Sequence, residues 1–430
     1  MNIDGNREPC TSAPARASLG HNITALYALQ LANYLIPLIT LPYLIRSLGV
    51  ANYGALAIAC AVVYFLVLFV DAGFNTQATR ELARPGITHE RIREIFAATQ
   101  WIKIAQVFIA FMVLTLLVLM VPSLRDNKAL YFASFLMVLG SLMFPTWLFQ
   151  GLEIMHYTTL FSVGGRLLAM IGIFTWVRTP DDLVIAAMLQ ASATALSGTL
   201  CWPLLKQRLG LTLWLPRHQL LSVIRCRLNE TRQLACSEYL TNAISNSGVF
   251  ILSLFAVDSL VGIFAALEKL TRAAFSVFQP LLKALFPRIS CRWQSHTDDA
   301  GAYTTAWSMR IVLLALGAAL ALAMLAPAML EILFGPDFTA HAALLRLLSV
   351  WLLLAVTAAV VGQFRLLARG LQSHYSLCLV AAGTLQFIAI VYGAAVYGLH
   401  GIVVAMVCSE AIRLALFTCA LHPPTLAVRR

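Results

Sequence analysis

Long apolar runs separated by short polar links dominate the chain. A helix needs about 20 mostly apolar residues to cross the hydrocarbon core of a bilayer, and twelve runs in the 430 residues approach or exceed that length. The pattern therefore predicts an all-α membrane protein with about 12 transmembrane helices. The expected spans are residues 22–44, 54–78, 97–121, 129–151, 159–178, 182–205, 233–255, 260–286, 304–327, 342–364, 375–398 and 400–422.

The distribution of basic residues among the links predicts the orientation. An even number of helices puts both termini on one side, and cytoplasmic links are enriched in Lys and Arg. With a cytoplasmic N-terminus, the inner links and tails carry eighteen basic residues, and the outer links carry only Arg46, Arg125, Lys128 and Arg178. We therefore expect a multi-pass membrane protein with both termini in the cytoplasm.

A basic segment, residues 206–232, divides the predicted helices into six and six. The link Leu48–Ala57 after the first helix is echoed by Phe255–Ala266 after the seventh, about 208 residues later. Halves with equal helix numbers insert with the same topology and are related by an axis along the membrane normal. The sequence thus predicts two pseudo-symmetric six-helix bundles. The expected segments are a cytoplasmic tail 1–21, the bundle 22–205, the linker 206–232, the bundle 233–422 and a cytoplasmic tail 423–430.

The composition supports a membrane protein and argues against other classes. The chain is 60% hydrophobic and 11% charged, whereas soluble domains average about 25% charged residues. The net charge of +11 arises largely from basic residues in the links, so we expect no nucleic-acid partner. The nine cysteines form no C-x-x-C pair or metal spacing, and no common catalytic or nucleotide-binding motif occurs. We therefore expect no metal, no cofactor and no enzymatic activity. The polar segment Met1–His21 lacks the apolar core of a cleavable signal peptide.

Ionisable residues inside the apolar runs are candidates for function, because charge within a bilayer is costly. Eight basic residues fall there: Lys103, Arg166, Lys269, Arg272, Lys283, Arg310, Arg346 and Arg413. Five of them lie near helix ends, where we expect long side chains to extend to the headgroups; these are Lys103, Arg166, Lys283, Arg310 and Arg346. Arg413 lies deeper, and it either faces a cavity or pairs with Glu410.

The densest charge cluster is Glu268-Lys269-Leu270-Thr271-Arg272 in the predicted eighth helix. Glu268 and Arg272 are four residues apart and share a helix face, so we expect them to pair. Lys269 adds a second cation, which leaves positive charge after that pairing. The cluster indicates either a structural ion pair or, as we favour, a cavity for an anionic group. Gln279-Pro280 in the same run offers a bending point.

The first predicted hairpin carries related features. Pro37 and Pro42 lie within its first helix and remove backbone donors, which predicts a bent or irregular helix. Arg46 follows at its outer end. Asp71 lies in the inner third of the second helix, just before Gly73. Two interpretations fit Asp71. In the structural one it pairs with Arg80 or with a helix end. In the functional one it is a proton or cation site, or a gate between the halves.

These residues resemble a known family. The first hairpin resembles the N-terminal hairpin of Wzx-like O-antigen and polysaccharide flippases. The resemblance is carried by the pattern Pro37-x4-Pro-x3-Arg-x2-Gly-x4-Gly, followed by Asp71-x-Gly-Phe and Thr79-Arg-Glu-Leu-Ala. The sequence VGIFAALEKLTRAAFSVFQPLLKALFPRIS, residues 261–290, is similar to the eighth helix of that family, and Phe-Gly-Pro-Asp-Phe at 334–338 resembles its link after helix nine. The family belongs to the multidrug/oligosaccharidyl-lipid/polysaccharide exporter superfamily.

The resemblance implies a flippase in a bacterial inner membrane that serves O-antigen or exopolysaccharide synthesis. Its substrate would be an undecaprenyl-diphosphate-linked oligosaccharide, moved between leaflets by alternating access of the two bundles. Polymerase and chain-length proteins of the same pathway, and membrane lipid, are the implied partners. A lipid diphosphate is anionic, so the substrate-binding candidates are Arg46, Lys269, Arg272 and Arg310. The coupling or gating candidates are Asp71 and Glu268.

Three other functions fit parts of the pattern. An ion-coupled multidrug antiporter of the same superfamily would favour cavity carboxylates, yet basic residues outnumber acidic ones within the runs. A lipid II flippase often carries additional helices, for which the chain has no length. A membrane glycan polymerase or ligase would need a long outer loop with basic and histidine residues, and no predicted outer link is long.

Overall fold

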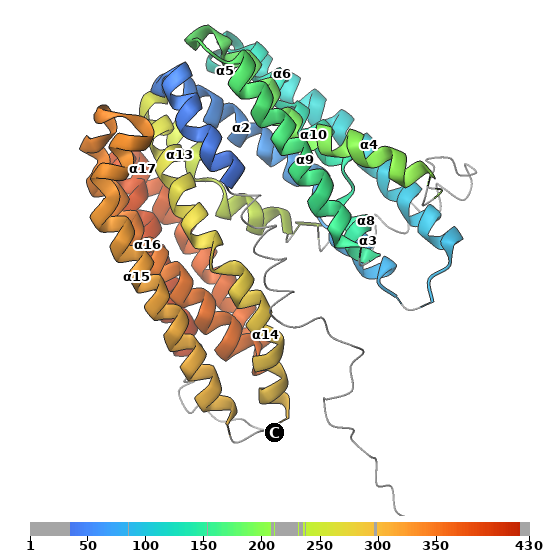
Figure 1. Cartoon of the computed structure of the whole chain (residues 1–430), viewed down its shortest axis with the longest axis vertical. Coiled ribbons are helices and arrows are strands. Elements are labelled where there is room, and N and C mark those ends of the chain that lie inside the picture. Colours follow the sequence, from blue (N-terminus) through green and yellow to red (C-terminus); the bar gives the residue numbers. More distant parts are fainter. Residues whose placement is uncertain are drawn as a thin grey trace, which may run out of the picture.

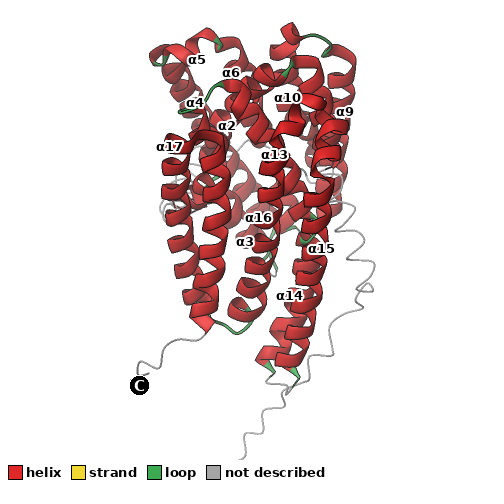
Figure 2. Cartoon of the chain, turned by 90° about the vertical axis from the view of Figure 1, so that its left-hand side faces the viewer, coloured by secondary structure: helices red, strands yellow, loops and turns green. Residues whose placement is uncertain are grey.

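The computed structural model describes residues 35–421, with gaps at 85, 153, 208–209, 211–230, 232–234, 237 and 296–298. All regular secondary structure in these residues is helical (Figure 2). Eight segments of this described part are long and apolar enough to cross a membrane, and they are Val50–Asp71, His89–Met120, Lys128–Gly151, His156–Trp176, Pro180–Gln207, Ala300–Phe334, Pro336–Leu367 and Gln372–Leu421. The predicted tails 1–21 and 423–430, and nearly all of the linker 206–232, lie outside the described residues.

The N-terminal half, as far as Gln207, begins with the shorter apolar helix Leu35–Leu48. The following helices are α2 (Val50–Asp71), α3 (Phe74–Leu82), α4 (His89–Met120), α5 (Pro122–Asp126), α6 (Lys128–Ser134), α7 (Leu136–Met143), α8 (Thr146–Gly151), α9 (Met155–Trp176), the 3-10 turn Pro180–Asp182 and α10 (Leu183–Gln207). Helices α6 to α8 follow one another and are interrupted only at Phe135 and at Phe144–Pro145.

The C-terminal half is described from residue 235, except for residues 237 and 296–298. Its helices are α12 (Gly248–Ser253), α13 (Asp258–Ser276), α14 (Gln279–Gln294), α15 (Ala300–Phe334), the 3-10 helix Pro336–His341, α16 (Ala342–Val360), the π-helix Val361–Leu367 and α17 (Gln372–Leu421). Most core residues of both halves belong to one hydrophobic cluster.

Two predicted helices are interrupted in the structure. The span predicted at 54–78 ends as α2 at Asp71, and α3 begins after Gly73, whose φ of 70° favours glycine. The span predicted at 260–286 breaks at Val277–Phe278. Pro280 then lies in the first turn of α14, where its missing N–H disrupts no helical bond. The prediction of continuous helices was wrong at both places, although the bending point near Pro280 is confirmed.

The charge pattern of residues 79–95 predicts a short amphipathic cytoplasmic stretch. In the structure these residues are divided between the end of α3 and the first turns of α4. The helix Leu35–Leu48 stays helical through Pro42. Near its start, the Thr40 hydroxyl donates a hydrogen bond of 3.1 Å to the carbonyl oxygen of Pro37.

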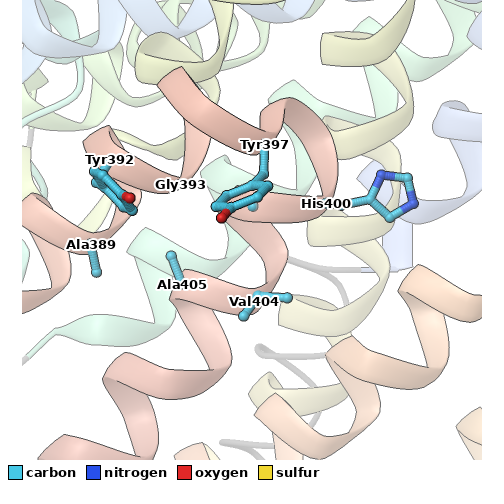
Figure 3. Close-up of a pocket in the computed structure, with 8 residues that line it drawn as sticks. Ala389, Tyr392, Gly393, Tyr397, His400, Val404 and Ala405 are labelled. Carbon is cyan, nitrogen blue, oxygen red and sulfur yellow. The ribbon is translucent and has the colours of Figure 1, made fainter.

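Helix α17 reverses direction at Gly398, where φ is 56° and ψ is −132°. The rings of Tyr375 and Phe417, near the two ends of α17, consequently stack with centroids 5.3 Å apart. Beside the reversal lies an apolar pocket of about 430 Å³, with Tyr392 and Tyr397 along its wall (Figure 3). The helix boundary predicted at residue 399 thus falls beside the reversal.

The order of helices in the N-terminal half recurs in the C-terminal half with an offset of about 208 residues. Helices α2 and α13 each follow a copy of the repeated link, and each ends in a break before a second helix. The long α4 corresponds to α15, and Lys128–Gly151 corresponds to Pro336–Leu367. Helices α9 and α10 correspond to the two arms of α17. The echo noticed in the link sequences therefore extends through the order of the helices.

The two copies of the repeated link lie directly against each other. A Cβ atom on Gly54 would overlap the carbonyl oxygen of Asp258, and one on Gly262 would lie 2.5 Å from the carbonyl oxygen of Val50. Helices α2 and α13 therefore meet backbone to backbone, as small residues permit at helix crossings. In Figure 1 the two halves are close together near this crossing and spread apart toward the opposite end. We call these the converging end and the diverging end.

Substitution of Gly54 tests this contact. We expect Gly54→Ala to lower the free energy of unfolding by about 1–3 kcal/mol, because the added Cβ must push α2 away from α13. The measurement is thermal unfolding of the purified protein in detergent. Gly317→Ala is the matched control, since a Cβ on Gly317 of α15 meets no atom within 4 Å. Equal unfolding temperatures for the two variants would contradict the close approach.

Candidate functional site

Four polar or reactive side chains of α2, one beside Gly54 and three farther along the helix, lie on one helix face. Tyr53, Cys60, Tyr64 and Asp71 are separated by seven, four and seven residues, which keeps them on one side of an α-helix. Cys60 and Tyr64 of this face interact electrostatically with Lys269 and Arg272 of α13, and Asp71 at its end pairs with Lys103 of α4. This face of α2 forms one wall of the candidate site.

The facing wall comes from α13 and carries the predicted charge cluster. Lys269 is close enough to Cys60 to interact electrostatically with it, and Arg272 is likewise close to Tyr64. Tyr64 and Arg272 are 208 residues apart, the same separation as Gly54 and Gly262. Residues in equivalent positions of the two halves therefore oppose each other along the α2–α13 interface.

The guanidinium of Arg272 is held by two acceptors. Its Nε donates to Glu268 Oε1 at 2.9 Å, and Nη2 lies 2.8 Å from the same oxygen. Nη2 also donates to the carbonyl oxygen of Ser245 at 3.0 Å. The side chain of Arg272 nevertheless keeps 38% exposure, against 12% for Glu268. The predicted pairing of Glu268 with Arg272 is confirmed, and the arginine retains an accessible surface.

Lys269 lies one residue after Glu268 and is half-buried. Within the described residues no carboxylate pairs with Lys269, because the nearby Glu268 is bonded to Arg272. The cluster therefore contains two cations and one carboxylate. An anionic ligand would restore charge balance at this point.

Asp71 is part of a buried ion pair with Lys103 of α4. The Nζ of Lys103 lies 2.7 Å from Asp71 Oδ1 and also donates to Asn75 Oδ1 at 3.3 Å and to the Ser141 carbonyl at 3.1 Å. Lys103 is 1% exposed and Asp71 is 31% exposed. The expectation that Lys103 extends to the headgroups was wrong, because three oxygens within the N-terminal half hold its ammonium group.

Tyr64 connects this ion pair with the cluster on α13. It lies close enough to interact electrostatically with both Arg272 and Asp71. The sequence suggests Arg80 as a structural partner of Asp71, whereas in the structure the partner is Lys103. Asp71 lies seven residues from the inner end of the predicted span 54–78, and Lys103 lies six residues from the inner end of the span 97–121. This similar depth is the signal in the sequence that could have indicated their pairing.

Arg46 and Arg310 lie apart from this cluster. Arg46 is exposed at the converging end, where its Nη2 donates to the carbonyl oxygen of Ile332 in α15 and so joins the two halves. Arg310 is exposed on α15, with its guanidinium 5.0 Å from the ring centroid of Trp307. Of the six predicted site residues, the structure gathers Glu268, Lys269 and Arg272 on α13 with Asp71 nearby.

Two contacts at the site involve residues beyond the six predicted ones. Glu238 of the C-terminal half accepts a hydrogen bond of 3.1 Å from the backbone N–H of Gly73, at the break between α2 and α3. No sequence motif indicates a role for Glu238. Its partner is the backbone N–H of Gly73, which is available only because the helix breaks there, and hydropathy does not predict that break. Glu410 pairs with Arg413 at 2.7 Å, and Arg413 also lines a cavity, so both expectations for Arg413 are confirmed. Glu410 also interacts electrostatically with Arg272.

Metal ligation is not indicated in the part of the chain that the structure describes. No group of three or more His, Cys, Asp or Glu side chains suited to a metal ion occurs there.

Several solved structures share this fold. An inward-facing multidrug resistance MATE transporter of the MOP superfamily has a TM-score of 0.65 at 13% identity, covering 92% of this chain and 98% of that one. The lipid II flippase MurJ, in an inward closed conformation, also has a TM-score of 0.65 at 13% identity, with 93% and 86% coverage. The fold is thus that of multi-pass membrane transporters, consistent with the eight candidate spans.

Curated relatives match nearly the whole chain. A putative O-antigen transporter of Escherichia coli (strain K12) is 29% identical over 378 residues, which cover 87% of this chain and 90% of the relative. A putative O-antigen transporter of Shigella dysenteriae is 27% identical over 396 residues, with 91% and 97% coverage. A family model described as polysaccharide biosynthesis protein matches residues 19–293. This match covers more than half of the sequence and confirms the resemblance seen in the hairpin and α13 motifs, and the chain belongs to the polysaccharide biosynthesis protein family.

Proposed function

We propose that the protein is a flippase that moves an undecaprenyl-diphosphate-linked oligosaccharide from the inner to the outer leaflet of a bacterial inner membrane. The family match and the relatives named as putative O-antigen transporters support transport of a lipid-linked polysaccharide unit. The observation that carries the proposal is the excess of cations over carboxylates where α13 faces α2. Such a site suits a diphosphate better than a cationic drug.

The diphosphate would contact Lys269 and the exposed part of Arg272. Hydrogen bonds between guanidinium or ammonium groups and phosphate are strengthened by charge, and water-poor surroundings increase the effect. Tyr64 and Ser245 lie around Arg272 and add polar groups for the neighbouring sugars. The isoprenoid chain would remain in the bilayer, because apolar chains gain nothing from entering a polar site.

Twelve transmembrane helices in two six-helix bundles fit this function. In that arrangement, Leu35–Leu48 is the described part of the first helix, the helical residues around α12 belong to the seventh, and the arms of α17 are the eleventh and twelfth. The boundaries 22–205 and 233–422 for the bundles, with a linker at 206–232, follow the same division. The basic inner links support a cytoplasmic location for both termini.

Alternating access would proceed by rocking one half against the other. With the basic links in the cytoplasm, the diverging end faces inward and the converging end faces outward. The Gly54–Gly262 contact then closes the outer side and leaves the cluster on α13 available from the inner side. The fold similarity to an inward-facing transporter supports this assignment.

Neutralising the cluster tests the site. We expect Lys269→Gln and the double variant Glu268→Gln/Arg272→Gln each to reduce export roughly 10- to 100-fold, since a hydrogen bond to a charged group contributes about 1.5–3 kcal/mol. Export is measured as surface polymer in a deletion strain that expresses each variant. Lys128→Gln, an exposed lysine at the converging end, is the control. Wild-type export by both cluster variants at normal expression would contradict diphosphate binding here.

The transport function itself is tested separately from the site. A strain that lacks this protein should accumulate radiolabelled lipid-linked repeat units on the inner leaflet, and the wild-type chain should clear them. A polymerase or ligase deficiency would instead accumulate the units on the outer leaflet. Absence of inner-leaflet accumulation would therefore exclude a flippase even if the cluster binds an anion.

Asp71 is proposed as a coupling or gating residue, and its ion pair allows structure to be separated from function. We expect Asp71→Asn to destabilise the protein by about 3–5 kcal/mol, because it leaves the buried ammonium of Lys103 without its partner. Lys103→Met should cost less, because Asp71 is 31% exposed and its charge remains in contact with solvent. The double variant should recover most of that stability yet still lose export. Thermal unfolding and export measured in parallel distinguish the two effects.

The control for this ion pair is Arg91→Gln. Arg91 pairs with Glu94 at 2.7 Å, but its side chain is 50% exposed, so we expect a change below about 1 kcal/mol. Wild-type export by the stable double variant would show that Asp71 has only a structural role.

A further inference from the structure

A second polar cavity lies inside the C-terminal half, apart from the α2–α13 interface. It has a volume of about 310 Å³ and is bounded by α13, α14, the end of α16, the π-helix and both arms of α17. Its polar wall is formed by Gln279, Lys283, Gln363, Tyr375 and Arg413, and apolar side chains form the rest. Of these five residues only Arg413 is linked to the transport site, through Glu410, which interacts electrostatically with Arg272. None of the five is a proposed contact of the transported diphosphate.

The wall of this cavity is built around an unusual backbone. The chain forms a π-helix from Val361 to Leu367, and the N–H of Ala368 donates to the carbonyl of Gln363 at 3.1 Å. A Cβ on Gly362 would lie 2.9 Å from ring atoms of both Tyr375 and Phe417, so only glycine lets these rings pack on the π-helix. Segments of π-helix are rare and frequently occur at functional sites.

Charge in the cavity is unbalanced in favour of cations. Arg413 pairs with Glu410 at 2.7 Å, and its side chain is 24% exposed. Its Nε is buried and finds no acceptor among the described residues. Lys283 faces the same cavity, and its ammonium forms no ion pair within the described part of the chain. A buried donor without an acceptor is uncommon in proteins, so the cavity is suited to an oxygen-rich anion.

The depth of the cavity indicates where that anion comes from. Tyr375 lies in the first turn of α17, and Arg413 lies about two turns before its end. These positions place the cavity near the diverging end of the helices, at the level where lipid headgroups meet the hydrocarbon core.

Basic and aromatic side chains gather at the same end. The guanidinium of Arg369 lies 4.2 Å from the ring centroid of Trp293, and that of Arg292 lies 3.9 Å from that of Tyr303. This combination is typical of a membrane interface. By contrast, the pocket beside Gly398 at the opposite end has no lysine or arginine in its wall (Figure 3).

We propose that this cavity binds the headgroup of an anionic bilayer phospholipid, with Arg413 and Lys283 contacting the phosphate. The Nε–H of Arg413 donates to a phosphate oxygen, and Glu410 holds the guanidinium in place. One acyl chain lies along the apolar part of the wall, where Phe417 and Leu379 are located. The bound lipid would join α14, the π-helix and α17 and so stiffen the C-terminal half. The proposal does not depend on which substrate the protein transports.

The test uses the purified full-length chain in neutral detergent. We expect phosphatidylglycerol to raise the midpoint of thermal unfolding by about 3 °C, a shift typical of a modest stabilisation in a chain of this size. Phosphatidylcholine with the same acyl chains should raise it by less than half as much. Lys283→Gln and the charge-neutral double variant Glu410→Gln/Arg413→Gln should each remove most of the phosphatidylglycerol shift. Lys128→Gln at the converging end is the control and should keep the full shift.

Four results would overturn the proposal. They are an absent shift with phosphatidylglycerol, an equal shift with phosphatidylcholine, an unchanged shift in the Lys283 variant, and a variant-sensitive shift of the same size with inorganic diphosphate alone. The last result would assign the cavity to a water-soluble anion. Lys283 is exposed, so its variant keeps the test decisive even if the Glu410/Arg413 variant fails to fold.

Discussion

The rest of the structure depends on the close approach of two glycines, Gly54 and Gly262, at one end of the molecule. Because neither carries a Cβ, α2 and α13 meet backbone to backbone. Two straight helices that touch at one point must separate along their remaining length, and α2 and α13 therefore present facing side chains below the crossing. Polar side chains of α2 and the charged side chains of α13 lie in this space. They do so because they come about two to five helical turns after Gly54 and about two to three turns after Gly262.

The charges below the crossing fall into two kinds, which differ in their counter-ions. Lys103 is surrounded by oxygens of its own half and is almost inaccessible, so its charge is neutralised within the protein. On α13, Glu268 is bonded to Arg272, and Lys269 has no carboxylate of its own. The site is thus approximately neutral on the α2 side and positive on the α13 side. In the proposed function, this asymmetry would attract an anionic group without a large excess of buried charge in both halves.

Sequence reasoning succeeded where a single physical rule determines the outcome. The thickness of the hydrocarbon core determines the length of apolar runs, and the helical repeat determines that Glu268 reaches Arg272. It failed where the backbone or a distant helix decides. The break at Gly73 depends on φ, which hydropathy does not report. The pairing of Asp71 with Lys103, and the bond from Arg46 to the backbone of α15, require knowledge of which helix faces are adjacent.

The strength of the contacts suggests how such a molecule changes shape. The ion pairs Asp71–Lys103, Glu268–Arg272 and Glu410–Arg413 each join side chains of one half. Among the described residues, the contacts between the halves include no ion pair. They are glycine and apolar packing, single hydrogen bonds from Arg46 and from Gly73, and the electrostatic interactions of Cys60 with Lys269 and of Tyr64 with Arg272. Breaking a buried ion pair is far more costly than exchanging single hydrogen bonds with water. Separation of the halves at the converging end would therefore leave these three ion pairs intact, as the proposed alternating access requires.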